Sequence, residues 1–366
     1  MRILHLLPHL SGGGAERQFS YLAPELVRMG HDVHAAYSTD GPIRPELPGV
    51  VLHQFKSRSN YDPYLLLQLQ RLIRSIKPDI IHTWILQMDI LGGLVAKLNR
   101  IPWILREPVQ APGYLPSWKY RLRIWVGSGA SAIVSNSRGG DRYWEIQRPK
   151  SRRYVVPNGL PVYEIDRIDT ILTRGLPNSK SPIVLNVGRL VEVQKRQKAF
   201  LEALAYVKQK QEVLGVLCGE GPQKPEFEWL KHKLGLDANV LFTGYLPAVS
   251  CWQLMKKASV FVSLSAFEGC PNAVMEAMAC GCPLVVSDIP AHREILDESC
   301  ARFVDPSNIQ QTATTIVQCL RDVDASKDRA LVAKQKAQQW SIAGMAKNYE
   351  TVYNEVLSLH SPAVGK

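Results

Sequence analysis

The chain lacks several features that define common protein classes. Its 366 residues contain no apolar run of 18 or more, and the best stretch, residues 80–98, is interrupted by polar residues such as His82 and Asp89, so no membrane-spanning helix is expected. The seven cysteines all follow residue 217 without a CxxC pair, which argues against a disulfide framework or a cysteine zinc site. The N-terminus is too short and too polar for a signal peptide. We therefore expect reduced thiols and a cytoplasmic protein.

Acidic residues are scarce in the N-terminal half. Residues 1–153 hold 21 Lys and Arg against 11 Asp and Glu, which accounts for +10 of the net charge of +11. Residues 117–153 alone carry +7. This asymmetry indicates an anionic partner. No zinc finger, RNA-recognition motif or repeated basic helix is present, so we expect no nucleic acid and favour an anionic membrane surface or a lipid-pyrophosphate acceptor.

Strands and helices alternate in both halves of the chain. The first half opens with the apolar strand Arg2–Leu7, a glycine loop and an amphipathic helix from Phe19 to Met29; the second opens with the strand Ile183–Val187. The other expected strands are Val33–Tyr37, Ile80–Thr83, Trp103–Arg106, Ala132–Ser135, Val213–Cys218, Val240–Thr243, Val260–Leu264 and Pro283–Ser287. Such alternation predicts an α/β protein with two Rossmann-like, doubly wound parallel sheets.

The composition also suggests where the domains divide. We expect an N-terminal domain over 1–160, a linker rich in Pro, Asn, Ser and Lys over 161–180, and a C-terminal domain over 181–340. A last helix over 341–358 carries apolar residues at helical spacing, and the tail 359–366 is expected to be disordered.

Residues 267–281 form the most informative stretch. They follow an apolar run that is typical of a buried parallel strand. Pro271 and Asn272 mark a helix start, with Asn272 expected as the cap, and Gly281 is placed to end the helix. The pattern predicts a strand, a tight acidic loop and a helix whose free N–H groups face that loop.

Glu276 gives this stretch its chemistry. A helix N-terminus attracts an anion, and a carboxylate one turn into the helix can accept two hydroxyl hydrogen bonds. An anion beside a diol is what a nucleotide sugar offers, and Glu268 lies in the loop between them.

Two cations follow the first strand of the second half. Arg189 lies in Gly188-Arg189-Leu190, and Lys195 comes six residues later. At the top of a parallel sheet such cations suit a diphosphate leaving group. A solvated basic turn is the better explanation for Lys195 taken alone, because Arg196 and Lys198 continue the charge run. Beside the Glu268 loop, the functional interpretation is favoured.

Taken together, these motifs resemble retaining family-4 glycosyltransferases of the GT-B fold, in which two Rossmann-like domains face across a cleft. The motifs are Gly-Arg-Leu at 188–190, Lys195, Gly-Glu-Gly-Pro at 219–222, Phe-Thr-Gly-Tyr at 242–245, and Glu268 followed by Glu276. The resemblance covers nearly the whole chain and is more specific in the C-terminal half than in the N-terminal half.

The resemblance implies a role for each matching residue. Arg189 and Lys195 would bind the donor diphosphate, Glu268 would lie beside the donor sugar, and Glu276 would hold the ribose hydroxyls. The base, sugar, phosphate and domain-approach contacts would come from Gly13, Gly14, Gly188, Gly219, Gly244, Tyr245, Leu246, Gly269, Asn272 and Ala273. The N-terminal domain would bind the acceptor.

The acceptor side departs from the family pattern. Many relatives carry a His where this chain has Arg106 and Glu107, and their His-x-His is here His82-Thr83-Trp84. Arg106 could bind an acceptor phosphate and Glu107 could orient an acceptor hydroxyl. A structural ion pair is an equal alternative.

Two further segments bear on partners. A helix over 118–126 would place Trp118 and Trp125 on one side and Arg123 elsewhere, which fits either an interfacial membrane helix or a helix packed on the sheet by its Trp face. The one D-x-D, Asp322-Val323-Asp324, lies at a helix end, where a solvated turn is the better interpretation. With two cations at the donor site, we expect no metal.

The resemblance thus implies a hexosyltransferase that uses a UDP-sugar in preference to a GDP-sugar. The acceptor would be a hydroxyl of a lipid-linked or polysaccharide glycan in bacterial lipopolysaccharide or capsule synthesis, with peripheral attachment to the inner face of the cytoplasmic membrane. Alternatives are a nucleotide-sugar-binding protein without transfer activity and a GT-B epimerase. A nicotinamide enzyme is disfavoured, because no G-x-G-x-x-G follows the first strand.

Overall fold

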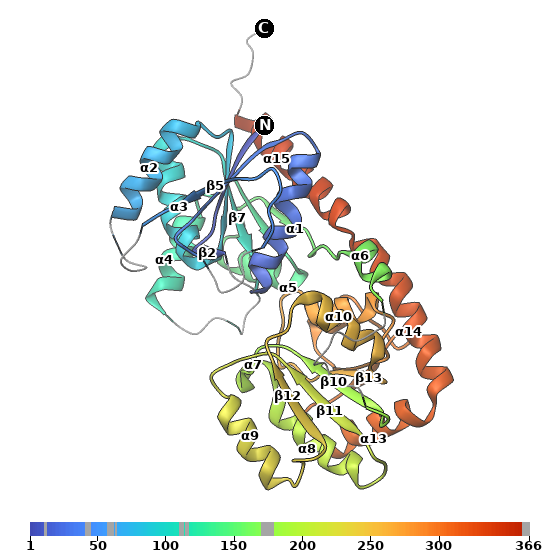
Figure 1. Ribbon diagram of the computed structural model, residues 1–366. Coiled ribbons are helices and arrows are strands. Elements are labelled where there is room, and N and C mark those ends of the chain that lie inside the picture. The colour runs from blue at the N-terminus through green and yellow to red at the C-terminus, as the bar shows by residue number, and fades with distance from the viewer. Residues whose placement is uncertain are drawn as a thin grey trace. The chain divides into compact units, whose positions relative to one another are not determined.

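The chain folds into two compact units (Figure 1). The computed structural model describes residues 1–10, 13–40, 45–56, 62, 64–109, 113, 117–169 and 179–360. Unit 1 comprises Met1–Gly159 and Ile342–Lys366, and unit 2 comprises Leu160–Ser341. Residues 170–178 of the expected linker and 361–366 of the expected tail lie outside the described residues.

Unit 1 is built on a seven-stranded parallel sheet with the strand order β5-β3-β1-β6-β7-β8-β9. The strands are β1 Arg2–Leu6, β3 Asp32–Tyr37, β5 Val51–Gln54, β6 Ile80–Trp84, β7 Trp103–Glu107, β8 Ala132–Ser135 and β9 Arg153–Val155. A separate parallel pair joins β2 (His9–Leu10) to β4 (Thr39–Asp40). The strand order reverses between β1 and β6, which is the point where open α/β sheets place ligands.

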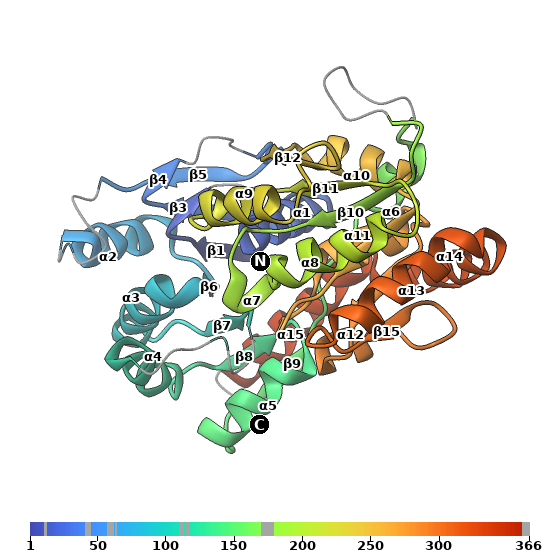
Figure 2. The ribbon, with the colours of Figure 1, turned by 90° about the horizontal axis from the view of Figure 1, so that it is seen from below.

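Helices cover both faces of this sheet. On one face lie α2 (Tyr64–Ile76), α3 (Ile85–Asn99) and α4 (Trp118–Gly127), and on the other lie α1 (Gly14–Arg28) and α15 (Ile342–His360) (Figures 1 and 2). Helix α5 (Arg138–Gln147) packs beside β8 and β9. Side chains alternate along each strand, so neighbouring core residues serve opposite faces.

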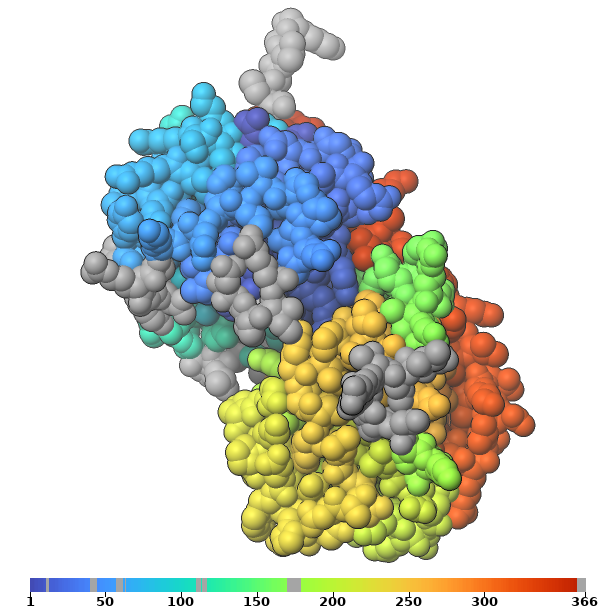
Figure 3. Space-filling model, viewed as in Figure 1, coloured from blue at the N-terminus to red at the C-terminus, as the bar shows by residue number. Residues whose placement is uncertain are grey.

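Helix α15 closes the core of unit 1. Its residues Met345, Tyr349, Tyr353 and Val356 are buried in the same cluster as α1. The apolar spacing predicted for the last helix is therefore confirmed. On the opposite face, the light-blue helix α2 forms part of the outer surface of unit 1 (Figure 3), where Leu67 is exposed.

Unit 2 repeats the plan with six parallel strands in the order β12-β11-β10-β13-β14-β15. The strands are β10 Ile183–Val187, β11 Leu214–Cys218, β12 Val240–Gly244, β13 Val260–Ser263, β14 Leu284–Ser287 and β15 Arg302–Val304. The helices are α6 Val162–Arg167, α7 Glu192–Lys195, α8 Gln197–Lys208, α9 Lys224–Lys233, α10 Ala248–Lys257, α11 Asn272–Ala279, α12 Pro290–Arg293, α13 Ile309–Arg321 and α14 Val323–Ala337. The order reverses between β10 and β13.

Helix α4 corrects one expectation. It forms as predicted, but its buried residues are Arg123, Val126 and Gly127, whereas Trp118 and Trp125 are 63% and 59% exposed. The alternative of a helix packed on the sheet by its Trp face is therefore wrong. The physical reason is that two buried carboxylates pull Arg123 inward.

Two smaller features concern helix ends and length. Asn272 is the first helical residue of α11, not its cap; Pro271 holds the cap position, with no side-chain cap hydrogen bond. Asp322, in the D-x-D sequence, caps α14 by accepting a hydrogen bond from Ala325 N–H. None of the described helices is both long and apolar enough to cross a bilayer.

Candidate functional site

The switch point of unit 2 holds a partly buried ion pair. Lys195 is the last residue of α7, and Glu268 follows β13. The distance from Lys195 Nζ to Glu268 Oε1 is 2.5 Å. Their side chains are 19% and 8% exposed. Burial alone would raise the pKa of Glu268, but the Lys195 ammonium and the Ser265 hydroxyl outweigh burial and lower that pKa. The carboxylate is therefore held ionised beside a cation.

Two residues that the sequence analysis did not single out hold the Glu268 carboxylate in place. Ser265 Oγ donates to Glu268 Oε1 over 2.7 Å, and the Gln194 side-chain amide donates to Oε2 over 3.4 Å. The backbone of Ala266 also donates to the Gln194 carbonyl at 2.8 Å, which ties α7 to the Glu268 loop. The one signal in the sequence that could have identified Ser265 is its position as a polar residue just after an apolar strand.

Arg189 presents the second cation of this edge. It is exposed, and within the described part of the chain its guanidinium makes a single long contact, 3.4 Å from Nη2 to Gln194 Oε1. No described carboxylate pairs with it. The structure thus brings Arg189, Lys195 and Glu268 to the same loop cluster, with one of the two cations neutralised and the other not.

Glycines let three neighbouring strand ends approach closely. Gly188 N–H donates to Cys218 O at 2.9 Å, and Gly219 N–H donates to Gly244 O at 2.8 Å. Gly219 has φ +139°, and a Cβ there would lie 2.0 Å from Gly188 O. Loop–loop packing therefore requires glycine at position 219, whatever it contacts in a ligand, and Gly244 has a positive φ of +71°. Next to them, Tyr245 is 45% exposed and Leu246 packs against the core.

The N-terminus of helix α11 faces this edge, and its C-terminus ends in a defined capping motif. Gly269 is buried, and Asn272 and Ala273 are half-buried in the loop and first turn. Glu276 is 2% exposed, one turn in. At the C-terminus Gly281 adopts φ +69°, and its N–H and that of Cys282 bond to Met278 O and Ala277 O, a Schellman motif. The predicted helix stop at Gly281 is confirmed.

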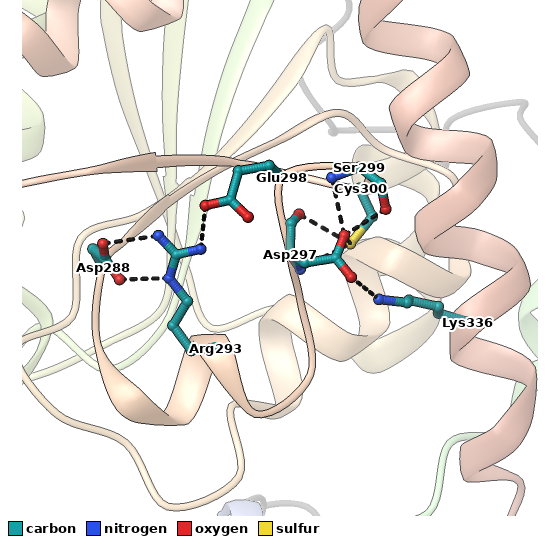
Figure 4. Close-up of polar contacts among 7 residues, drawn as sticks. All are labelled: Asp288, Arg293, Asp297, Glu298, Ser299, Cys300 and Lys336. Atoms are coloured by element: carbon teal, nitrogen blue, oxygen red, sulfur yellow. Dashed lines mark hydrogen bonds and ion pairs between the residues drawn. The ribbon is translucent and has the colours of Figure 1, made fainter.

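The segment after β14 is fastened by surface ion pairs (Figure 4). The Arg293 guanidinium lies between Asp288 and Glu298, at 2.7 and 2.9 Å from the two Asp288 oxygens. A second pair joins Lys336 of α14 to Asp297, and this contact lowers the pKa of Asp297. These contacts brace α12, whose His292 is fully buried and donates from Nδ1 to Ser287 O.

In unit 1 the glycine loop opens α1. Gly13 is the cap and Gly14 the first helical residue, and both are exposed. A Cβ on Gly13 would lie 2.2 Å from Glu16 Oε2, so the Glu16 carboxylate folds back over the helix N-terminus. His9 Nδ1 lies 2.9 Å from Glu16 Oε1. This hydrogen bond is the main reason that the pKa of His9 is raised.

Arg106 and His82 lie on the α1/α15 face of the unit 1 sheet. Arg106 is 2% exposed; its Nη2 donates to Asn158 Oδ1 at 2.7 Å, its Nε donates to Tyr349 Oη at 3.3 Å, and its guanidinium stacks 4.5 Å from the Trp84 ring. His82 lies 2.7 Å from Tyr353 Oη. Burial, reinforced by the neighbouring His5 ring and the Arg106 charge, lowers the pKa of His82, so its imidazole is neutral.

Glu107 lies on the opposite face and serves a different network. Its Oε2 accepts from Arg123 at 2.6 Å and from Trp144 Nε1 at 2.8 Å. Arg123 also pairs with Asp89 at 2.7 Å. Burial raises the pKa of Asp89 to about 6, although Arg123 opposes that shift. The structure therefore separates Arg106 from Glu107, and the alternative of a structural ion pair is confirmed for Glu107, whose partner is Arg123.

Two doubly wound parallel-sheet units are the architecture of the GT-B class of glycosyltransferases. Residues 168–340 match the family model described as glycosyl transferases group 1, and residues 12–163 match glycosyltransferase family 4. The chain belongs to this glycosyltransferase family and is a transferase enzyme with the GT-B fold.

Named relatives and solved structures agree with this assignment. The chain is 24% identical to the N-acetylgalactosamine-N,N'-diacetylbacillosaminyl-diphospho-undecaprenol 4-alpha-N-acetylgalactosaminyltransferase of Campylobacter jejuni, over 93% of this chain and 95% of that one. It is 26% identical to the lipopolysaccharide core biosynthesis glycosyltransferase LpsD of Rhizobium meliloti, over 90% of each. The crystal structure of Anabaena Alr3699/HepE in complex with UDP and glucose shares the fold, with TM-score 0.83 and 19% identity over 97% of this chain and 100% of that one.

Proposed function

We propose that this glycosyltransferase moves a sugar from a UDP-sugar to a hydroxyl of a lipid-linked or polysaccharide glycan with retention of configuration. The observation that carries the donor side is the Lys195–Glu268 pair at the unit 2 switch point, with Arg189 in the same loop cluster. The named relatives act on diphospho-undecaprenol glycans or in lipopolysaccharide core synthesis, which supports the acceptor class and a place in bacterial surface polysaccharide assembly.

At the donor site, the cations bind the diphosphate and the carboxylates bind hydroxyl groups. Arg189 and Lys195 bind the diphosphate and stabilise the charge that builds on it as the bond to the sugar breaks. Glu268 is ionised, so it accepts hydrogen bonds from the sugar hydroxyls, and Glu276 does the same for the ribose. Because the guanidinium and the ammonium supply the positive charge, we propose that the reaction needs no metal ion.

Retention follows from front-side substitution. The acceptor oxygen forms its bond to the anomeric carbon on the face from which UDP departs, and the carbon–oxygen bond to the diphosphate breaks. The acceptor proton passes to the leaving diphosphate oxygen, so no separate general base is required. Arg189 and Lys195 lower the barrier by holding that oxygen's charge until the proton arrives.

We propose that unit 1 meets the membrane through helix α4. Trp118, Arg121 and Trp125 are exposed and spaced at i, i+3 and i+7, so they share one stripe of the helix. The ammonium of Lys97 lies 5.6 Å from the Trp125 ring and adds charge beside it. Exposed Trp with basic neighbours fits an anionic headgroup region. Arg123 belongs to the buried network and takes no part.

A transfer assay tests the reaction. The protein is incubated with radiolabelled UDP-sugars and a bacterial lipid extract, with and without EDTA. We expect lipid-soluble label and released UDP for at least one sugar, with the product linkage retaining the donor configuration by NMR and no effect of EDTA. UDP-sugar binding without label transfer would point to a binding protein, and conversion of the sugar to its epimer would point to an epimerase; either outcome would overturn the proposal.

A further inference from the structure

Arg106 presents a charge that the proposed donor chemistry does not use. It is the penultimate residue of β7 and lies level with Trp84, the last residue of β6, at the carboxyl edge of the unit 1 sheet. This edge is next to the β1/β6 switch point, where α/β sheets bind ligands. Arg106 therefore lies where ligand-binding residues are found in α/β sheets, although it is also buried.

The charge of Arg106 is buried without a counter-ion. Its contacts among the described residues are the Asn158 amide, the Tyr349 hydroxyl and the Trp84 ring, all of which are neutral. No described Asp or Glu comes within ion-pair distance of it. Glu107, the adjacent residue, faces the other side of the sheet and is satisfied by Arg123. A buried charge normally requires a partner, because desolvation costs several kcal/mol.

The guanidinium also keeps an unused donor edge. Its hydrogen bonds within the described part of the chain come from Nε and Nη2, which leaves the two N–H groups of Nη1. Nη1 is not among the buried atoms that lack a partner, unlike Nε2 of His5 and of His82, so it is not sealed from solvent. The guanidinium is thus positioned by three contacts, Arg106 as a whole is 2% exposed, and Nη1 is its remaining donor group.

We propose that Arg106 binds the diphosphate of the glycosyl acceptor in unit 1, a site separate from the donor diphosphate site of unit 2. This inference rests on the proposed function, because it assumes an acceptor that carries a diphosphate. A guanidinium matches phosphate oxygens with paired hydrogen bonds, and low surrounding polarity strengthens the attraction. The neutral His82 beside it adds no competing charge.

Calorimetric titration with inorganic pyrophosphate tests the site in the full chain. The starting protein carries Arg189→Ala and Lys195→Ala, which disable the donor diphosphate site. We expect this double variant to retain one pyrophosphate site, and Arg106→Met added to it to weaken binding by at least tenfold. Arg152→Met, which removes an exposed charge from the same unit, is the matched control and should change nothing. Equal affinities for the two triple variants, or no binding to the double variant, would overturn the proposal.

A structural role is separated by two more variants. Tyr349→Phe removes a contact of Arg106 but keeps the charge, so pyrophosphate affinity should stay within about twofold, whereas Arg106→Lys should recover part of the binding lost in Arg106→Met. Loss of binding in Tyr349→Phe equal to that in Arg106→Met would assign Arg106 to packing alone. These outcomes do not depend on transfer activity, so they are distinct from a failure of the proposed function.

A second probe distinguishes the acceptor diphosphate from a phospholipid headgroup as the ligand of Arg106. A membrane phospholipid headgroup offers a single phosphate, represented by glycerol phosphate, whereas the acceptor offers two. We expect pyrophosphate to bind at least tenfold more tightly than glycerol phosphate to the double variant. Equal affinities would contradict an acceptor diphosphate site.

Discussion

The carboxyl edges of the two sheets share a topology and differ in how their charges are balanced. At the unit 2 switch point Lys195 is paired with Glu268, whose carboxylate also accepts hydrogen bonds from Ser265 and Gln194. Near the unit 1 switch point, the side chains that contact Arg106 in the described part of the chain are all neutral. The first arrangement suits a substrate with both phosphate and hydroxyl groups, and the second suits an anion alone. The same fold thus supports two kinds of recognition through a few strand-end residues.

The buried network beneath α4 gives the largest expected effect on stability. Arg123→Met would leave Asp89 and Glu107 buried without their cation, which costs about 3–5 kcal/mol for a broken buried pair. We expect the unfolding transition of unit 1 to move to lower urea concentration while that of unit 2 stays. The exposed Arg121→Met is the control. Equal shifts for the two variants would show that the network does not hold unit 1 together.

Lys195 gives the largest expected effect on activity. If its ammonium stabilises the leaving diphosphate, Lys195→Ala should lower turnover by about 10²–10³, as loss of a preorganised charge stabiliser does. Lys198→Ala removes a nearby surface cation, paired with Glu226, and should leave turnover nearly unchanged. Steady-state rates measure both. If the turnover of Lys195→Ala stayed within a few-fold of wild type, Lys195 would not stabilise the leaving diphosphate, and the difference in function between the two sheet edges would be lost.

Helix α4 should respond to charge more moderately. Arg121→Glu changes the exposed stripe by two charges, each worth about 1 kcal/mol near an anionic surface, so binding to anionic vesicles should fall roughly 30-fold. Lys210→Glu on unit 2 makes the same charge change elsewhere and should have little effect. Sedimentation with anionic and neutral vesicles measures this. Equal losses in both variants would mean that overall charge, not α4, drives the binding.

His9 gives the smallest expected effect. Its pKa is raised by the Glu16 hydrogen bond, so Glu16→Gln should return that pKa toward the ordinary histidine value. The sign follows: protonated His9 stabilises the fold at pH below its unfolded pKa, and this contribution is lost as pH rises through the raised folded pKa. NMR titration of the His9 ring protons measures the shift, with the other histidines as internal controls. An unchanged His9 pKa would exclude Glu16 as the cause.

The sequence predicted the buried strands closely and the edge strands poorly. Strands such as β10 and β13 are mostly apolar and largely buried, so their runs stand out and their bounds agree within a residue or two. The short edge strands β5, β9 and β15 were not predicted, because their partly exposed residues carry no strong pattern. Their pairing comes from the neighbouring strand, which local sequence does not encode.

Helix α4 shows a second limit. Its helical spacing was evident, but the buried face was not, because Arg123 is drawn inward by partners 34 and 16 residues away in sequence. For the candidate site, motif spacing placed Arg189, Lys195 and Glu268 together. It did not show that Arg106 and Glu107 face opposite sides of the sheet, although strand alternation implies it.

The central claim, that unit 2 binds a nucleotide-sugar donor, is tested most directly by titrating UDP into the wild-type protein and the Glu276→Ala variant in a calorimeter. The account predicts saturable one-site binding to the wild type and affinity at least tenfold weaker in the variant, because a charged hydrogen bond is worth about 1.5–3 kcal/mol. Absence of UDP binding, or equal UDP affinity in the two proteins, would contradict it.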